Sequence, residues 1–245
     1  MNGNKPSTPN RNNRMEAKQI PDLTNALAAN AESPSAPLVH TDEFLLGTTE
    51  GGEIGELGWN TSGGTFVAQA ALVGRPGIVR RRANSNNTVT TLYLCPSANT
   101  ANYHWGEFVR QLWIVSPLQD TANQQIRLGV TSAVNSLAPA RCCMFGADQG
   151  DTNWHVYLRN GGLESKINTG VPFVPGNWYK LKMERKEQGQ LVFSVNGSTL
   201  EVADNPNEPS ADGGILTGMS ITPRSGGNYD MLLDFFTETI QPPAR

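Results

Sequence analysis

The feature that most constrains the fold is a regular alternation of apolar and polar residues between positions 179 and 197. Tyr179, Leu181 and Met183 alternate with charged residues, which is the period of a β-strand with one buried face. After a polar turn the alternation resumes and ends at Asn196-Gly197, a dipeptide that tolerates positive φ and closes tight turns. The pattern predicts an antiparallel meander whose apolar face packs on a second sheet.

The composition indicates that the same organisation continues through most of the chain. Of 245 residues, 25 are Gly and 16 are Pro, and only 17% are charged, which favours strands joined by turns over helices. A β-sandwich of ~200 residues is an ordinary single domain. The predicted strands are 44–46, 65–71, 78–81, 88–94, 107–115, 125–131, 141–145, 154–159, 164–168, 179–185, 191–195, 198–202, 218–223 and 231–239. Together they predict two stacked antiparallel sheets.

The first forty residues differ from the rest of the chain. Residues 1–14 are polar and basic with almost nothing to bury, which is typical of an extended arm. Asp22 is placed to cap a helix of about two turns within residues 20–29, and the Pro-rich segment 33–37 predicts a linker. We therefore expect two parts, a docking arm with one short helix over residues 1–40 and a sandwich domain over residues 41–245.

Charge and hydropathy exclude several classes of function. The net charge of −3 provides no global attraction to nucleic acid or to an anionic membrane. The run Arg80-Arg81-Arg82 is isolated and predicts a solvated rim more than a nucleic-acid contact. No run approaches the ~18 apolar residues that a membrane-spanning helix needs. The first residues contain no apolar core, so Sec-dependent export is not expected.

The three cysteines, Cys95, Cys142 and Cys143, are a poor disulfide framework because their number is odd and two are adjacent. They predict partly buried thiols in a protein assembled in a reducing cytoplasm. The three histidines are far apart in sequence, so the spacing predicts no tetrahedral metal site.

Several motifs carry a resemblance to known proteins. The residues 159–162, 176–179, 195–197 and 234–236, around the long hairpin, resemble a concanavalin A-like (laminin G-like) jelly roll. The segments 42–44, 52–59 and 75–79 are similar to such domains in bacteriophage virion proteins. Residues 20–29 are similar to segments that recur in phage tail fibres, although here the segment occurs as a single short copy.

The resemblance implies a component of the phage virion, either a tail-fibre or spike tip that attaches to the host, or a capsid decoration protein. Such proteins are commonly trimers with an N-terminal arm that docks on the particle. We therefore expect a homotrimer, assembled in the host bacterial cytoplasm, whose residues 1–40 contact other capsid or tail proteins. An arm too polar to fold alone agrees with this expectation, because its order must come from a partner.

Glycoside hydrolysis is the sharpest enzymatic hypothesis for this kind of fold. Retaining cleavage needs two carboxylates ~5 Å apart, and the acidic residues gather in the segments 50–56 and 230–238. In the second segment Asp230, Asp234 and Glu238 share one strand face by period two, but their Cα atoms are ~13 Å apart along it. We interpret both clusters as solvated turn and rim carboxylates. No nucleophile elbow and no phosphate-binding loop is present in the sequence, so we expect no enzyme.

Glycan binding is better supported, because a sugar ring is held by an aromatic surface flanked by polar side chains. Period two places Trp154 with aliphatic residues in the core and His155, Tyr157 and Arg159 on the opposite face. That face has three interpretations, namely a glycan site, an ordinary outer sheet face or a subunit contact. A second aromatic cluster, around Trp105, precedes a predicted strand and is expected at a loop tip or a sheet edge. The candidate glycan-binding residues are His155, Tyr157, Arg159, Asp151, Asn153 and Trp105.

A bound ion is a weaker hypothesis for the same region. Asp148, Asp151 and Asn153 could supply oxygen ligands to Ca²⁺, although the sequence lacks a full ligand loop. The prediction is therefore a non-enzymatic virion protein that displays a jelly roll, either to attach to host surface glycans or to decorate and stabilise the particle. The alternative is a bacterial carbohydrate-binding module or glycan hydrolase of the same fold.

Overall fold

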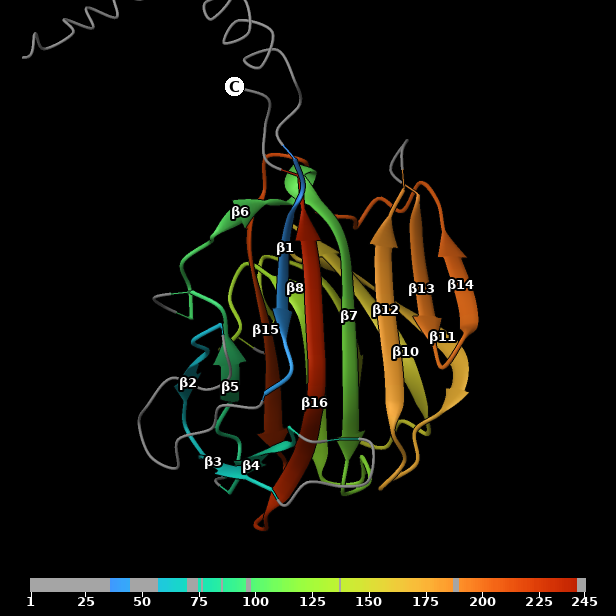
Figure 1. Ribbon diagram of the computed structural model, residues 1–245. Helices are drawn as coiled ribbons and strands as arrows, with labels where there is room; N and C mark the ends of the chain where they lie inside the picture. Colours follow the sequence, from blue (N-terminus) through green and yellow to red (C-terminus); the bar gives the residue numbers. More distant parts are fainter. Residues whose placement is uncertain are drawn as a thin grey trace, which may run out of the picture. The chain divides into compact units, whose positions relative to one another are not determined.

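The computed structural model of the chain describes residues 36–44, 57–69, 75, 77–84, 86–95, 98–136, 138–186 and 190–241. Within these residues sixteen β-strands form two antiparallel sheets that lie face to face (Figure 1). The all-β prediction is confirmed for this part of the chain. The predicted helix at 20–29, the arm before residue 36 and the acidic segment 50–56 lie outside the described residues. None of the described helical segments is long and apolar enough to cross a membrane.

The front sheet of Figure 1 has the strand order β14-β13-β12-β7-β16-β4-β3, and β1 also pairs with β16. Its strands are β1 (Leu38–Asp42), β3 (Thr65–Ala68), β4 (Val79–Ala83), β7 (Phe108–Pro117), β12 (Tyr179–Arg185), β13 (Leu191–Val195), β14 (Ser198–Val202) and β16 (Tyr229–Ile240). The meander predicted from the alternating pattern is β12-β13-β14. Asn196 and Gly197 have φ of 51° and 90°, as the tight turn between β13 and β14 requires.

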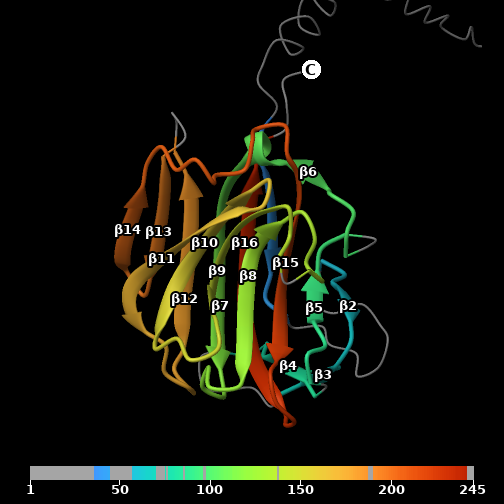
Figure 2. The same cartoon turned by 180° about the vertical axis from the view of Figure 1, so that it is seen from behind.

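The back sheet, seen from its outer side in Figure 2, has the order β11-β10-β9-β8-β15-β5-β2, and β6 also pairs with β15. Its strands are β2 (Asn60–Ser62), β5 (Thr90–Tyr93), β6 (Tyr103–His104), β8 (Gln124–Thr131), β9 (Arg141–Ala147), β10 (Asn153–Asn160), β11 (Leu163–Pro172) and β15 (Gly214–Pro223). A short 3-10 helix, Trp105–Glu107, follows β6. Strands β8 to β11 form a second meander, in which each strand pairs with the next.

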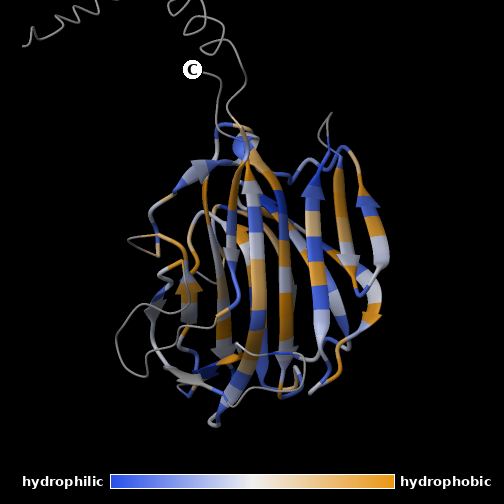
Figure 3. Ribbon diagram, in the orientation of Figure 1, coloured by the Kyte–Doolittle hydropathy of each residue, from blue (hydrophilic) through white to orange (hydrophobic). Residues whose placement is uncertain are grey.

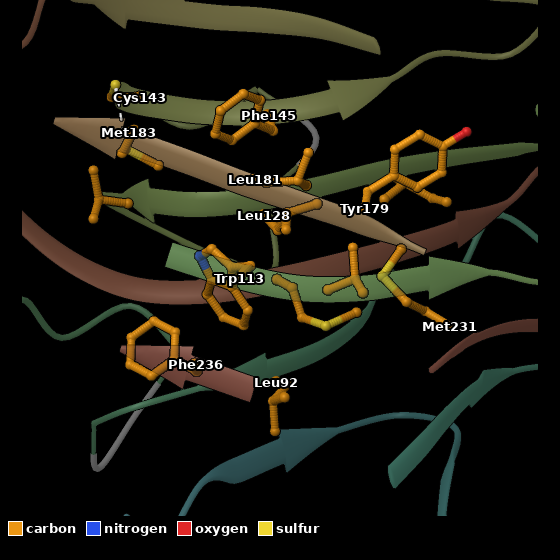
Figure 4. Close-up of a cluster of buried hydrophobic side chains, with 14 of the residues drawn as sticks. Leu92, Trp113, Leu128, Cys143, Phe145, Tyr179, Leu181, Met183, Met231 and Phe236 are labelled. Carbon is orange, nitrogen blue, oxygen red and sulfur yellow. Dashed lines mark hydrogen bonds between the residues drawn. The ribbon is translucent and has the colours of Figure 1, made fainter. Parts of the chain in front are cut away.

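The core lies between the two sheets, because the long strands turn apolar positions inward. Figure 3 shows this alternation as changing colour along β7, β12 and β13. At the centre, Trp113 and Phe236 pack with ring centroids 4.5 Å apart, and both side chains are fully buried. Figure 4 shows Leu128 and Phe145 of the back sheet facing the same cluster. Trp154 also packs inward, against Phe173 and Tyr179, as the sequence predicts.

Three short strands are absent from the sequence-based prediction, namely β1, β2 and β6. β1 begins at Leu38 and so straddles the boundary expected between residues 40 and 41, while the compact unit that contains it begins at Pro37. β2 and β6 have only three and two residues, too few for a period of two to be recognised in sequence, and β1 falls in the segment interpreted as an arm.

A β-bulge in β16 changes which residues face the core. Leu233 pairs with Val115 and Phe235 pairs with Ile114, so Asp234 is an extra residue on β16. Before the bulge Met231 and Leu233 are in the core, whereas after it Phe236, Glu238 and Ile240 are there. The expectation that Asp230, Asp234 and Glu238 share a face is therefore wrong. Glu238 is buried between the sheets and is not a rim carboxylate.

The arginine run of β4 also differs from the prediction of a solvated rim. Strand alternation turns Arg81 into the core, where its guanidinium donates to the carbonyl oxygens of Ser62 and Gly63. Burial lowers the pKa of Arg81 to about 9. Arg82 points outward and donates two hydrogen bonds, 2.8 and 2.9 Å long, to the Asp230 carboxylate. These two side chains are therefore structural.

Candidate functional site

The predicted residues of β10 lie on the outer face of the back sheet. His155, Tyr157 and Arg159 share this face, as period two requires, and Asp151 lies beside them. The Tyr157 ring is nevertheless fully buried, because the Arg127 guanidinium lies 3.4 Å above its centroid. The aromatic surface that a sugar would stack on is therefore covered.

The charged groups around Tyr157 are already paired with one another, in what we call the outer cluster: Arg127, Asp148, Asp151, Tyr157 and Lys166. Lys166 Nζ lies 3.1 Å from Asp148 and 2.8 Å from Asp151, and Tyr157 donates its hydroxyl to both carboxylates. Desolvation acts to raise the pKa of Asp148, but Arg127 and Lys166 together outweigh it and hold that pKa below 3.8. Such pairing is typical of a structural network.

The remaining predicted residues of this region are also held by protein groups. His155 Nδ1 is 3.3 Å from Asp151 Oδ2, and Arg159 pairs with Glu164 at 3.1 Å. Asn153 is partly buried at the start of β10, and its carbonyl oxygen contacts the His155 ring. Within the described residues no group of three or more His, Cys, Asp and Glu side chains is arranged to hold a metal ion.

Trp105 does not lie at an exposed loop tip, so that expectation is corrected. Its side chain is fully buried in the 3-10 helix and stacks on Phe108 at a centroid distance of 5.1 Å. Its indole Nε1 donates to Glu208 at 2.9 Å. No described contact joins it to the β10 residues, so the six predicted glycan-binding residues do not form one site.

A pocket of ligand size opens at a different place, between the edges of the two sheets. It has a volume of about 350 Å³, and its lining comes from β1 of the front sheet, from β2 of the back sheet and the residues just before it, and from the segments that follow β5 and precede β6. We call it the lateral pocket. Its lining residues are His40, Leu57, Gly58, Asn60, Leu94, Cys95 and Asn102. The lining thus combines apolar side chains with two amides and one imidazole.

His40 connects the lateral pocket to a buried polar network. Its Nδ1 lies 3.6 Å from Glu238 Oε2, on the strand that pairs with β1, and 40% of its side chain is exposed. The other carboxylate oxygen, Oε1, accepts hydrogen bonds from Tyr103 Oη, Gln111 Nε2 and Thr217 Oγ1. The Glu238 side chain is only 1% exposed, whereas the His40 ring in contact with it is 40% exposed. The imidazole is therefore the part of this pair that a ligand in the pocket can reach.

The pairing with Glu238 determines the charge of His40. A hydrogen bond to the carboxylate is the largest influence on the pKa of His40 and raises it above 6.5, although burial acts in the opposite direction. The contact with the carboxylate therefore favours the protonated, positively charged form of His40. Burial and the neighbouring Glu238 charge raise the pKa of Tyr103 well above 10, so its phenol stays neutral.

A second buried carboxylate, Asp42, fixes the other wall of the pocket. Its oxygens accept hydrogen bonds from the backbone of Phe44 and Leu57 and from Trp59 Nε1, with distances of 2.7, 3.1 and 2.8 Å. Because Leu57 and Trp59 are tied to β1 in this way, the pocket-lining residues beside them are held in place. Asp42 is itself 1% exposed and so does not face the pocket.

Sequence reasoning missed the lateral pocket. His40 falls in the segment interpreted as an arm, and its partner Glu238 lies beyond a bulge that period two does not reveal. A signal was nevertheless present, because Leu38–Asp42 is a strand-like run in which His40 and Asp42 alternate with Val39 and Thr41.

Comparison with known proteins was informative only at the level of structure. No protein-family model and no curated protein matches the sequence. A protein of unknown function from Shewanella oneidensis MR-1 is similar over 98% of each chain, with 10% identity and a TM-score of 0.59. A prokaryotic β-1,3-1,4-glucanase (lichenase) derived from a mouse hindgut metagenome matches over 82% of this chain and 98% of its own, with 9% identity and a TM-score of 0.51. The carbohydrate recognition domain of Emp47p matches over 83% and 95%, with 10% identity and a TM-score of 0.52.

The fold is that of a concanavalin A-like jelly roll. The structural part of the sequence-based resemblance is thus confirmed. Identities near 10% establish the architecture alone, and the activity of the jelly roll must be argued from its own residues.

Proposed function

We propose that this protein is a non-catalytic component of a bacteriophage virion that binds a host-surface glycan in the lateral pocket. The observation that carries the proposal is the lining of that pocket. Leu57 and Leu94 offer apolar surface, while His40, Asn60 and Asn102 offer polar groups within a volume of about 350 Å³. A sugar ring has an apolar face and a rim of hydroxyls, so it suits such a mixed lining.

The state of the nearby carboxylates supports binding without cleavage. Glycoside hydrolysis needs two carboxyl groups that both face the bond to be cleaved. Asp42 and Glu238 are each 1% exposed, and each already accepts three hydrogen bonds from protein donors. Neither is presented to a ligand.

The virion assignment rests on the sequence motifs shared with phage proteins and on the polar arm. We propose that the segment before the compact unit, residues 1–36, docks on capsid or tail proteins and that the protein is a homotrimer in the particle. The jelly roll would then be displayed outward, as either a fibre tip or a decoration protein. No cofactor is required for this role.

A glycan array probed with the full chain tests the binding site. We expect His40→Ala to lose about tenfold or more in affinity for the best glycans, because it removes a hydrogen-bonding group from the pocket. His155→Ala is the matched control, since it removes a carboxylate-paired histidine from the β10 face. A loss confined to His155→Ala would place the ligand on β10 instead. Digestion of the bound polysaccharides by the wild-type chain would support the hydrolase alternative.

Association with particles tests the arm separately. We expect deletion of residues 1–35 to remove the protein from purified particles, as measured by immunoblotting, while glycan binding of the deleted protein is unchanged. This separation is expected because the compact unit begins at Pro37 and contains the whole lateral pocket. Normal incorporation of the shortened protein would contradict a docking role for the arm.

A further inference from the structure

If the lateral pocket binds a glycan, as proposed above, its chemistry also indicates which class of glycan it binds. This inference therefore rests on the proposed function. The lining contains one side chain that can carry a positive charge, His40, within the described residues. Asn60 Nδ2 donates to the backbone oxygen of Cys95, and Asn102 Nδ2 donates to that of Leu94. Each of these amides therefore already uses one of its hydrogen-bond donors within the pocket wall. His40 is therefore the strongest recognition group in the pocket.

The imidazole is oriented by the contact behind it. Because Nδ1 is directed at Glu238 Oε2, the opposite ring nitrogen, Nε2, is the atom available to a ligand, and no described residue forms a hydrogen bond with it. When the ring is protonated, Nε2–H is a charged donor. When the ring is neutral, with its proton on Nδ1 beside the carboxylate, Nε2 is an acceptor and repels an anion.

Among the described groups around His40, the imidazole itself is the one whose protonation would change the charge that a ligand meets. Glu238, from β16, is anchored by three donors, and Tyr103, from β6, is a neutral phenol within the same network. Asp42, two residues along β1, is directed into its own three hydrogen bonds. The remaining titratable group is the thiol of Cys95 in the pocket wall, which is 8% exposed.

We propose that the lateral pocket selects acidic sugars, and that the protonated His40 donates from Nε2 to the ligand carboxylate while Glu238 holds the ring from behind. A carboxylate is the sugar substituent that gains most from a charged donor, since charge-assisted hydrogen bonds are about twice as strong as neutral ones. The apolar residues Leu57 and Leu94 contact the ring, and His40 contacts its charge. The binding is reversible and involves no covalent step.

The test compares matched sugars that differ only in the carboxylate, by titration calorimetry or NMR with the full chain. The probes are glucuronic, galacturonic and mannuronic acids with glucose, galactose and mannose. We expect at least one acid to bind about tenfold more tightly at about pH 5.5 than at about pH 9, because His40 loses its proton as the pH rises through its raised pKa while the sugar carboxyl stays ionised. The neutral sugars are expected to show no such change.

Two variants test whether the pH dependence of binding comes from His40. His40→Gln keeps a polar side chain of similar size but cannot be charged, so it is expected to remove the pH dependence. His155→Gln should retain it, because that ring lies on the outer face of the back sheet. Preference for neutral sugars at both pH values, abolished by His40→Ala, would overturn the acidic specificity and leave the proposed function standing. Absence of binding by every probe and by the glycan array would overturn both.

Discussion

Insertion of one alanine between Phe235 and Phe236 is expected to abolish cooperative folding of the jelly roll. The bulge at Asp234 already supplies the one extra residue that β16 carries at that point, and from Phe235 to Thr239 the strand pairs residue by residue with β7. With a further residue, Phe236 and Glu238 would turn toward solvent, and the polar Thr237 would turn inward. A shift of one residue moves a whole hydrophobic set to the wrong face, and Phe236 alone packs against both Trp59 and Trp113.

The control for this insertion is Asp234→Ala, which changes the bulge residue and keeps the length of the strand. Asp234 pairs with Arg75 near the surface, so we expect this variant to lose only about 0–1 kcal/mol of unfolding free energy. Circular dichroism during urea unfolding distinguishes the two variants. A protein with the insertion that unfolds cooperatively at the wild-type urea midpoint would show that folding does not depend on the register of β16 after the bulge.

Replacement of Glu238 by Ala is expected to lower the unfolding free energy by about 3–5 kcal/mol, even though it removes a single charge. The reason is the set of donors that would lose their acceptor. Tyr103, Gln111 and Thr217 all donate to Glu238 Oε1 in a region that is closed to water. Glu238→Gln, which retains an oxygen acceptor of the same size, is expected to cost clearly less than the Ala variant.

Glu184→Ala provides the comparison for an exposed carboxylate. Glu184 pairs with Lys182 and Lys186 on the outer side of β12, where solvent screens the interaction, and its loss is expected to cost about 0–1 kcal/mol. Urea unfolding of the three variants under one set of conditions measures the differences. If Glu238→Ala were no more destabilising than Glu184→Ala, the buried network around Glu238 would not stabilise the fold.

The architecture could be predicted where the alternation is long and unbroken. Strands β12, β13 and β14 have the predicted bounds, because each combines a strict period of two with a recognisable turn. The core positions of Trp113 and Trp154 follow from the same period, since their face-mates are apolar. In these segments local propensity and the final packing agree.

The candidate site could not be predicted, because its parts are brought together only by the fold. His40 and Glu238 are far apart in sequence, and their contact depends on the pairing of β1 with the part of β16 beyond the bulge. On β10 the sequence correctly placed Tyr157 on the outer face. It could not reveal that Arg127, from β8, covers the ring, because side-chain stacking across strands leaves no periodic signal.

The depth at which the three thiols lie has a practical consequence for labelling the protein. None of them forms a disulfide and all are buried, and burial raises the pKa of Cys142 to about 12 and that of Cys143 well above 9. Maleimides react with the thiolate at accessible sites, so the native cysteines are poor targets. A cysteine introduced at Leu163, which is 73% exposed, would be the fast-reacting site. A fluorophore could thus be attached to the jelly roll without first removing any native cysteine.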